Sequence, residues 1–157
     1  MSTIKIVMAC HRDDIAIPEN ELICPIQVGT ALASHRFEGM LHDDEGENIS
    51  EKNPYYCELT AQYWAWKNLD ADYYGLFHYR RYFSFSDKKF PTNYFADVPM
   101  ETNDAATLKE IGLEPERMRK IIEQYDFILP EQGQFVDGST IREQYNESPQ
   151  HHAEDLS

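Results

Sequence analysis

The run TIKIVMAC at residues 3–10 is the feature that most constrains the fold of this chain. Its β-branched and apolar residues predict a buried strand close to the amino terminus. The polar turn HRDD at 11–14 follows, at the carboxyl end of that strand. Because open α/β sheets bind their ligands at the carboxyl ends of the strands, His11 is a candidate binding residue.

The later patterns alternate between helix and strand. We expect the following elements in chain order: a short helix at 26–33, a helix at 55–68 with Asn53 as N-cap and Pro54 in its first turn, a strand at 75–83, a polar loop at 84–104, a helix from Glu114 to about Gln124, a strand at 125–130 and a helix capped by Ser139. This order predicts an α/β fold with a mostly parallel sheet and helices on its faces. The tail 148–157 starts a further pattern and stops, so we expect one domain over 1–157, shortened at its carboxyl terminus.

The helix at 55–68 carries the clearest amphipathic pattern. Tyr56, Leu59, Tyr63 and Trp66 are spaced three or four residues apart. This spacing predicts an apolar face, and because Tyr55 and Trp64 widen it, we expect the helix to be buried on much of its circumference.

The composition limits the classes of partner. The chain has 157 residues, with 14 Lys and Arg against 28 Asp and Glu, so its formal net charge is −14. Nucleic-acid binding requires a basic footprint, so we exclude nucleic acid as a partner. Aromatic residues make up 13%, which suits core packing and also the stacking of sugars. Three widely spaced cysteines, with no signal peptide and no long apolar run, indicate a cytoplasmic location, with peripheral contact at the inner face of the membrane as the remaining option.

The strand GLFHYRRYF at 75–83 is unusual because it carries cationic side chains among aromatic ones. Strict alternation puts His78 and Arg80 on one face and Arg81 on the other. A neighbouring imidazole and guanidinium suit a diphosphate or carboxylate ligand. The alternative is that the arginines pair with some of the many surface carboxylates, which is the more common role of such residues.

The loop HDDEG at 42–46 offers two adjacent carboxylates, Asp43 and Asp44. They are candidates for acid–base chemistry or for holding Mg²⁺ or Mn²⁺, which prefer oxygen ligands. Asn48 follows in the same loop, where it suits a turn as well as a ligand.

Two other groups of polar residues have weaker signals. Asp70 and Asp72 form an Asp-x-Asp pattern, but they precede the strand at 75–83 and would lie at its amino end, away from the ligand edge. His151 could act as a base or a metal ligand, or simply belong to a polar helix start.

Four blocks in this order resemble a bacterial family catalogued as a domain of unknown function: PIQVG at 25–29, NIS at 48–50, NPYYCELTAQYWAWKN at 53–68 and YYGLFHYRRYF at 73–83. The tail HHAEDL is similar to the same family. Its members occur in capsular and exopolysaccharide biosynthesis and are described as glycosyltransferases. The resemblance implies a GT-A-like, three-layer fold for nucleotide-diphospho-sugars, and hexosyltransferase activity.

The resemblance also implies roles for individual residues. The donor site is expected to comprise His11, Asn48, His78, Arg80 and Arg81, whose positive groups would neutralise the leaving diphosphate without a metal ion, although Mg²⁺ or Mn²⁺ could serve. The base for the acceptor hydroxyl is expected among Asp43, Asp44, Asp137 and His151. The implied partners are a nucleotide-sugar donor and a glycan or lipid-linked acceptor.

Two other interpretations stay open at this point. The chain could be a non-catalytic module that binds sugar nucleotides or glycans. It could also be a structural or partner-binding domain whose aromatic residues simply form its core.

Overall fold

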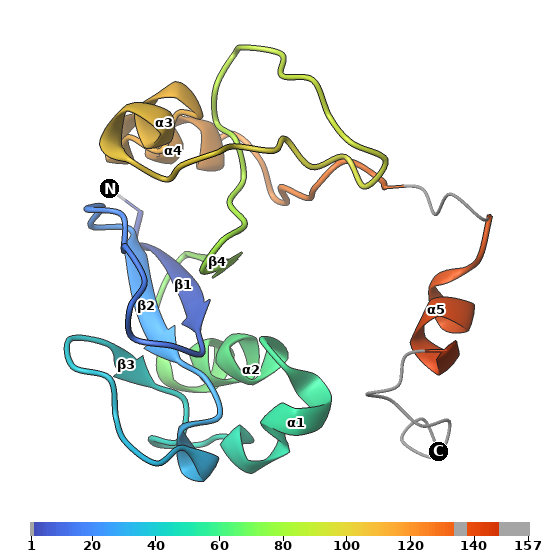
Figure 1. The fold of residues 1–157 in the computed structure, drawn as a ribbon. Helices are drawn as coiled ribbons and strands as arrows, with labels where there is room; N and C mark the ends of the chain where they lie inside the picture. The colour runs from blue at the N-terminus through green and yellow to red at the C-terminus, as the bar shows by residue number, and fades with distance from the viewer. Residues whose placement is uncertain (1, 134–137, 148–157) are drawn as a thin grey trace.

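The computed structural model describes residues 2–133 and 138–147. Its sheet contains the four strands β1 (Ile4–Cys10), β2 (Ile23–Gln27), β3 (Leu41–His42) and β4 (Tyr73–His78). All of the pairings are parallel, in the order β3-β2-β1-β4, which confirms the expected parallel sheet. The carboxyl ends of the strands therefore meet at one edge of the sheet, toward which the arrows of β1 and β2 point in Figure 1.

Alternation along β1 divides the interior into two layers of side chains. Ile4, Ile6 and Met8 point to a cluster that includes residues of helix α4 (Pro115–Ile122). Val7 and Ala9 point to the opposite face, where they meet helix α2 (Leu59–Asn68). The fold thus has helix, sheet and helix in three layers, as the sequence predicted (Figure 1).

The expected helix at 26–33 is wrong. Ile26 and Gln27 belong to β2, and only Thr30–Leu32 forms a single turn of 3₁₀ helix, η1. Gly29 stands between the two elements with φ +66°, where a β carbon would lie 2.8 Å from the side-chain oxygen of Asn53. A left-handed glycine at this point ends the strand and turns the chain.

The expected helix at 55–68 is interrupted. The chain forms a 3₁₀ turn η2 (Ser50–Lys52), a short helix α1 (Asn53–Tyr56) and then α2, with Cys57 between them at φ +47°. Pro54 lies in the first turn of α1, as predicted, but Asn53 is the first helical residue rather than the cap.

The buried face of α2 is narrower than predicted: it contains Trp64, but not Leu59 or Trp66. Thr60, Ala61, Trp64 and Ala65 are buried, whereas Leu59 is 51% and Trp66 is 66% exposed. The small side chains of this face let the helix approach the sheet closely. The buried Trp64 ring has a hydrogen-bond partner, because its Nε1 donates to the carbonyl oxygen of Glu45 at 2.7 Å. The aromatic stripe of the sequence therefore lies on the outside of the helix.

The carboxyl-terminal third contains less regular structure than expected. The loop at 84–104 and helix α4 are confirmed, and an unpredicted helix α3 (Ala105–Glu110) begins after Asp104, whose Oδ1 accepts from Thr107 N at 2.9 Å. The strand expected at 125–130 is wrong, because no strand among residues 2–133 and 138–147 pairs with it and Phe127 is 84% exposed.

Helix α5 (Ile141–Glu147) stands apart from the sheet (Figure 1). Its cap is Thr140 rather than the predicted Ser139. Thr140 Oγ1 accepts from the backbone N–H of Glu143, and Thr140 N donates to the Glu143 carboxylate. No helix of the described residues is long and apolar enough to cross a membrane.

Candidate functional site

The strand order places the candidate site between the ends of β1 and β4. Chain connections run outward from β1 through β2 to β3 on one side, and to β4 on the other. In parallel sheets, ligands bind at the carboxyl edge where the connections diverge in this way. His11 directly follows β1 and His78 is the last residue of β4, so the two histidines flank this point.

The ring of Tyr79 joins the predicted donor-binding residues into one cluster. Its centroid lies 4.7 Å from the His11 ring and 4.2 Å from the His78 ring. The Arg80 guanidinium lies over the same ring at 5.3 Å. The structure therefore brings together His11, His78 and Arg80, and it adds Tyr79, to which the sequence interpretation gave no role.

The expected strand at 75–83 ends early, which corrects the prediction about its faces. Tyr79 N still donates to Ala9 O at 3.1 Å, but the chain then turns so that His78 and Arg81 exchange two backbone hydrogen bonds. Alternation does not continue through this turn, so the prediction that it places His78 and Arg80 on one face is wrong. Instead the turn carries Arg80 and Arg81 at the tip of β4.

Both arginines at this tip are exposed and free of acidic partners. Neither guanidinium forms an ion pair with any residue that the structure describes. By contrast, Arg36 pairs with Asp44 at 2.7 Å and Arg117 pairs with Asp87 at 2.9 Å. The described residues therefore do not support the alternative that Arg80 and Arg81 form surface ion pairs.

The surroundings of His78 favour the neutral form of its imidazole. Burial lowers its pKa from the ordinary value, against the opposing effect of Glu58, and the nearby positive groups lower it further. Its Nε2 lies 3.2 Å from Glu58 Oε1, within ion-pair distance, and its Nδ1 accepts from the backbone N–H of Arg80 at 3.4 Å. The positive charge of this edge at neutral pH therefore comes from the arginines.

Glu58 is a site residue that the sequence interpretation missed. In the sequence it lies near the start of the helix expected at 55–68, where an acidic side chain interacts favourably with the helix dipole. The structure brings it to His78 across twenty positions of sequence, because α2 packs on the sheet beside β4. No local pattern in the sequence signals this contact.

The Asp43 carboxylate has a structural role, because its hydrogen bonds connect three segments of the fold. It is fully buried, and its Oδ1 accepts from Thr30 N at 3.0 Å and from Ser50 Oγ at 2.5 Å. Its Oδ2 accepts from Gly29 N at 2.9 Å. The carboxylate thereby connects the end of β3 to the loop after β2 and to η2. The base role expected for Asp43 stays a prediction, and the burial of the carboxylate does not favour it.

Asp44 and Asn48 also have local partners. One oxygen of Asp44 accepts from Arg36 at 2.7 Å, and its Oδ1 is buried without a hydrogen-bond partner among the described residues. The amide of Asn48 donates to the carbonyl oxygens of Asp44 and Gly46, which makes it a loop-forming residue. Its donor-binding role and the base role of Asp44 stay predictions.

The acidic loop does not fit a divalent cation in this arrangement. Both oxygens of Asp43 already accept hydrogen bonds, from three donors in total. A cation bound at Asp44 would lie beside the positive Arg36 guanidinium and be repelled by it. Across 2–133 and 138–147, no group of three or more His, Cys, Asp or Glu side chains is arranged to hold a metal ion. Asp137 and His151, the other two predicted bases, lie outside the described residues.

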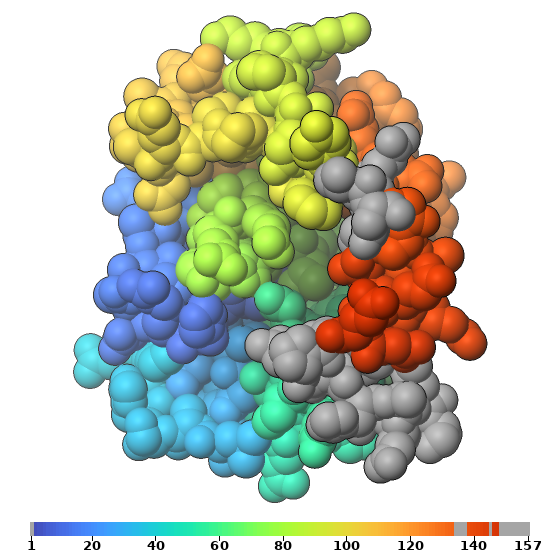
Figure 2. All heavy atoms as spheres, turned by 45° about the vertical axis from the view of Figure 1, so that its right-hand side comes forward, coloured from blue at the N-terminus to red at the C-terminus, as the bar shows by residue number. Residues whose placement is uncertain are grey.

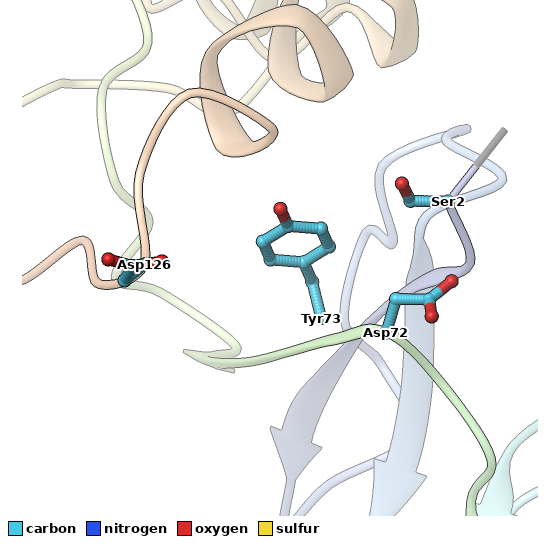
Figure 3. A pocket seen from close by; sticks show the side chains of 4 residues that line it. All are labelled: Ser2, Asp72, Tyr73 and Asp126. Carbon is cyan, nitrogen blue, oxygen red and sulfur yellow. The ribbon is translucent and has the colours of Figure 1, made fainter.

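A separate pocket lies at the opposite edge of the sheet. It has a volume of about 610 Å³ and is lined by Ser2, Asp72, Tyr73 and Asp126, with the Tyr73 ring between the two aspartates (Figure 3). Asp72 precedes β4 and accepts from Thr3 N at 2.7 Å. This confirms that the Asp-x-Asp pattern lies at the amino end of the strand, away from the cluster around Tyr79.

The face on which β4 and α5 lie is hollowed. Figure 2 shows a recess between the light-green segment that follows β4 and the red helix α5, with more distant green atoms at its floor. The fold is that of an α/β protein with a parallel sheet, and its cationic edge lies at the carboxyl ends of the strands, where such sheets bind their ligands.

Comparisons with known proteins agree with this class. Residues 5–157 match the sequence profile of the domain of unknown function DUF4422, so the chain belongs to that family. A solved structure of WbbM, a bifunctional glycosyltransferase in its apo form, matches with a TM-score of 0.85 and 35% identity. The match covers 98% of this chain and 27% of that one, so this chain spans about a quarter of its length. No curated protein matches the chain. The expected family and the GT-A-like fold are confirmed.

Proposed function

We propose that this chain is the donor-binding part of a glycosyltransferase that moves a hexose from a nucleotide-diphosphate donor to a glycan or lipid-linked acceptor. The observation that carries the proposal is a pair of exposed arginines, Arg80 and Arg81, at the carboxyl edge of a parallel sheet in a chain of net charge −14; neither forms an ion pair with any residue in 2–133 or 138–147. The similarity to part of a bifunctional glycosyltransferase supports it.

The chemistry follows from the charge that develops when the sugar leaves. Breaking the bond between the sugar and the diphosphate puts negative charge on the bridging oxygen, and fixed positive groups near that oxygen lower the barrier. Two guanidiniums can each bind phosphate oxygens in a bidentate manner. His11, packed edge-on against Tyr79, is placed to donate a further hydrogen bond to the same ligand.

The biological setting of the proposal is bacterial surface polysaccharide. The resemblance of the sequence blocks to proteins of capsular and exopolysaccharide biosynthesis supports this setting. The acceptor base remains to be assigned among Asp43, Asp44, Asp137 and His151. Of these, Asp43 and Asp44 have the partners described above, and the proposal rests on donor binding rather than on any one of them.

A non-catalytic module that binds sugar nucleotides is the second candidate. It is favoured by the fact that Asp43 is buried and Asp44 is paired with Arg36, so neither described candidate presents a free base. Both functions require the same arginines, and turnover of the bound donor separates them.

The test is a calorimetric titration of the chain with UDP, GDP and their glucose, galactose and mannose derivatives, with and without Mn²⁺. Arg80→Gln combined with Arg81→Gln should weaken binding at least about tenfold, because it removes charge-assisted hydrogen bonds to the diphosphate. The matched control replaces two exposed cations elsewhere, Lys89→Gln with Lys120→Gln, and should leave affinity within about twofold. Equal losses in both double variants would show a general charge effect and contradict the proposal.

A further inference from the structure

Glu58 and His78 form a carboxylate–imidazole pair that the diphosphate site does not use. Glu58 Oε1 lies 3.2 Å from His78 Nε2, with side chains 41% and 14% exposed respectively. The pair adjoins the turn that carries Arg80 and Arg81, and both guanidiniums act electrostatically on the His78 ring. It therefore belongs to the same edge of the sheet but has the opposite chemical character.

One oxygen of Glu58 is available to a ligand. Oε1 lies beside His78 Nε2, while Oε2 has no hydrogen-bond partner among the residues that the structure describes. The His78 ring is fixed in turn by the N–H of Arg80 at Nδ1 and by its contact with Tyr79. The imidazole thus stands on one side of the carboxylate, and the Glu58 side chain remains 41% exposed.

The backbone before Glu58 is strained in a way that sets this orientation. Cys57 adopts φ +47° and ψ −127°, a region that residues with a β carbon rarely occupy. The side chain of Asn53 holds the turn, since its Nδ2 donates to Cys57 O at 2.8 Å and to Thr60 Oγ1 at 3.1 Å. The break between α1 and α2 places Glu58 beside β4.

The character of Glu58 limits the part of a donor that it can contact. A carboxylate repels the phosphates that the arginines attract, so its partner must be a neutral group with hydroxyl donors. Tyr55 and Tyr56 on the adjoining α1 are 56% and 47% exposed. Their ring faces can pack on the apolar C–H face of a hexose, which a carboxylate that accepts from hydroxyls would complement.

We propose that Glu58, oriented by His78, binds the hydroxyl groups of the donor's hexose while the arginines of the turn hold its diphosphate. The inference rests on the proposed function and adds the sugar-recognising half of the same site. Glu58 accepts one or two hydrogen bonds through Oε2, and His78 keeps the carboxylate in place through its Nε2.

The experiment compares nucleotide sugars with the corresponding free nucleotides. Calorimetric titrations of UDP against UDP-glucose and UDP-galactose, and of GDP against GDP-mannose, are made on the unchanged chain and on Glu58→Gln. The variant should weaken binding of the preferred nucleotide sugar about tenfold or more, and leave its free nucleotide within about twofold. Retained nucleotide binding shows that the site of the variant is folded. Glu51→Gln, an exposed acid on η2 close in sequence, serves as control and should change neither affinity.

Two other results would overturn the inference alone, and a third would refute the proposed function as well. An affinity for the nucleotide sugar that is unchanged in Glu58→Gln overturns the inference and leaves the proposed function intact. An equal loss for the free nucleotide also overturns it, because Glu58 would then contact the ribose or support the fold. Failure of the unchanged chain to bind any of the five compounds refutes the proposed function itself, and the inference with it.

Discussion

Replacing Asp43 by Asn should destabilise the whole fold. The carboxylate accepts three hydrogen bonds, from Gly29 N, Thr30 N and Ser50 Oγ, at a position with no exposed surface. An amide keeps one acceptor oxygen and turns an NH₂ group toward at least one N–H or O–H donor. We therefore expect the loss of one charge-assisted hydrogen bond, the weakening of the others and one unpaired buried donor.

The magnitude follows from these three contributions. A hydrogen bond to a charged group contributes about 1.5–3 kcal/mol, and a buried donor without a partner costs about 1–3 kcal/mol. The sum predicts that Asp43→Asn lowers the free energy of unfolding by about 2.5–6 kcal/mol, a large part of the roughly 5–15 kcal/mol that stabilises a typical domain.

Urea denaturation followed by tryptophan fluorescence measures this loss, since Trp64 is buried between α2 and the sheet. Asp70→Asn is the matched control, because Asp70 is exposed, and its variant should lie within about 0.5 kcal/mol of the unchanged chain. A stability of Asp43→Asn equal to that of the control would refute the structural role. Such a result, together with abolished sugar transfer, would instead support the base role predicted from the sequence.

Three further predictions concern pH, backbone conformation and the packing of α2. Burial holds the pKa of His78 below its ordinary value of about 6.5, so the unfolded chain binds a proton at a pH where the folded chain does not. The free energy of unfolding should therefore fall as the pH drops below about 6.5. His78→Gln should reduce this fall when urea titrations at pH 7.5 and 5.5 are compared. Gly112→Ala should cost at least about 1 kcal/mol more than Gly39→Ala in the same assay, because both glycines have positive φ but only at Gly112 would a β carbon meet backbone atoms, 2.7 Å from Phe85 C. Trp64→Phe should cost about 1–3 kcal/mol through the unpaired Glu45 carbonyl and the lost fit, whereas Trp66→Phe should stay within about 0.5 kcal/mol; equal costs would contradict the observed orientation of α2.

The parts of the fold that the sequence predicts are those set by local patterns. The buried run of β1, the proline-started helix α4 and the α/β order follow from strand composition, helix-start signals and alternation. The position of His11 at the ligand edge follows from the polar turn after β1. These features need no knowledge of distant contacts.

The parts that the sequence does not predict depend on contacts between distant segments. The turn after His78 contains no glycine or proline, and it forms because Tyr79 pairs with Ala9 and Arg81 pairs back with His78. The break at Cys57 depends on the Asn53 side chain, and it is this break that gives His78 its partner Glu58. The outward face of Tyr56, Leu59 and Trp66 reflects the need for small residues where α2 meets the sheet.

Mapping the ligand by NMR tests the central claim most directly. Backbone amide shifts of the isotopically labelled chain are followed during titration with the nucleotide that binds tightest. The account predicts that the largest changes lie at His11 and at residues 78–81, on the carboxyl edge of the sheet, and that they disappear in the Arg80→Gln, Arg81→Gln double variant. Changes centred instead on Ser2, Asp72 and Tyr73, around the pocket at the amino edge, would contradict it.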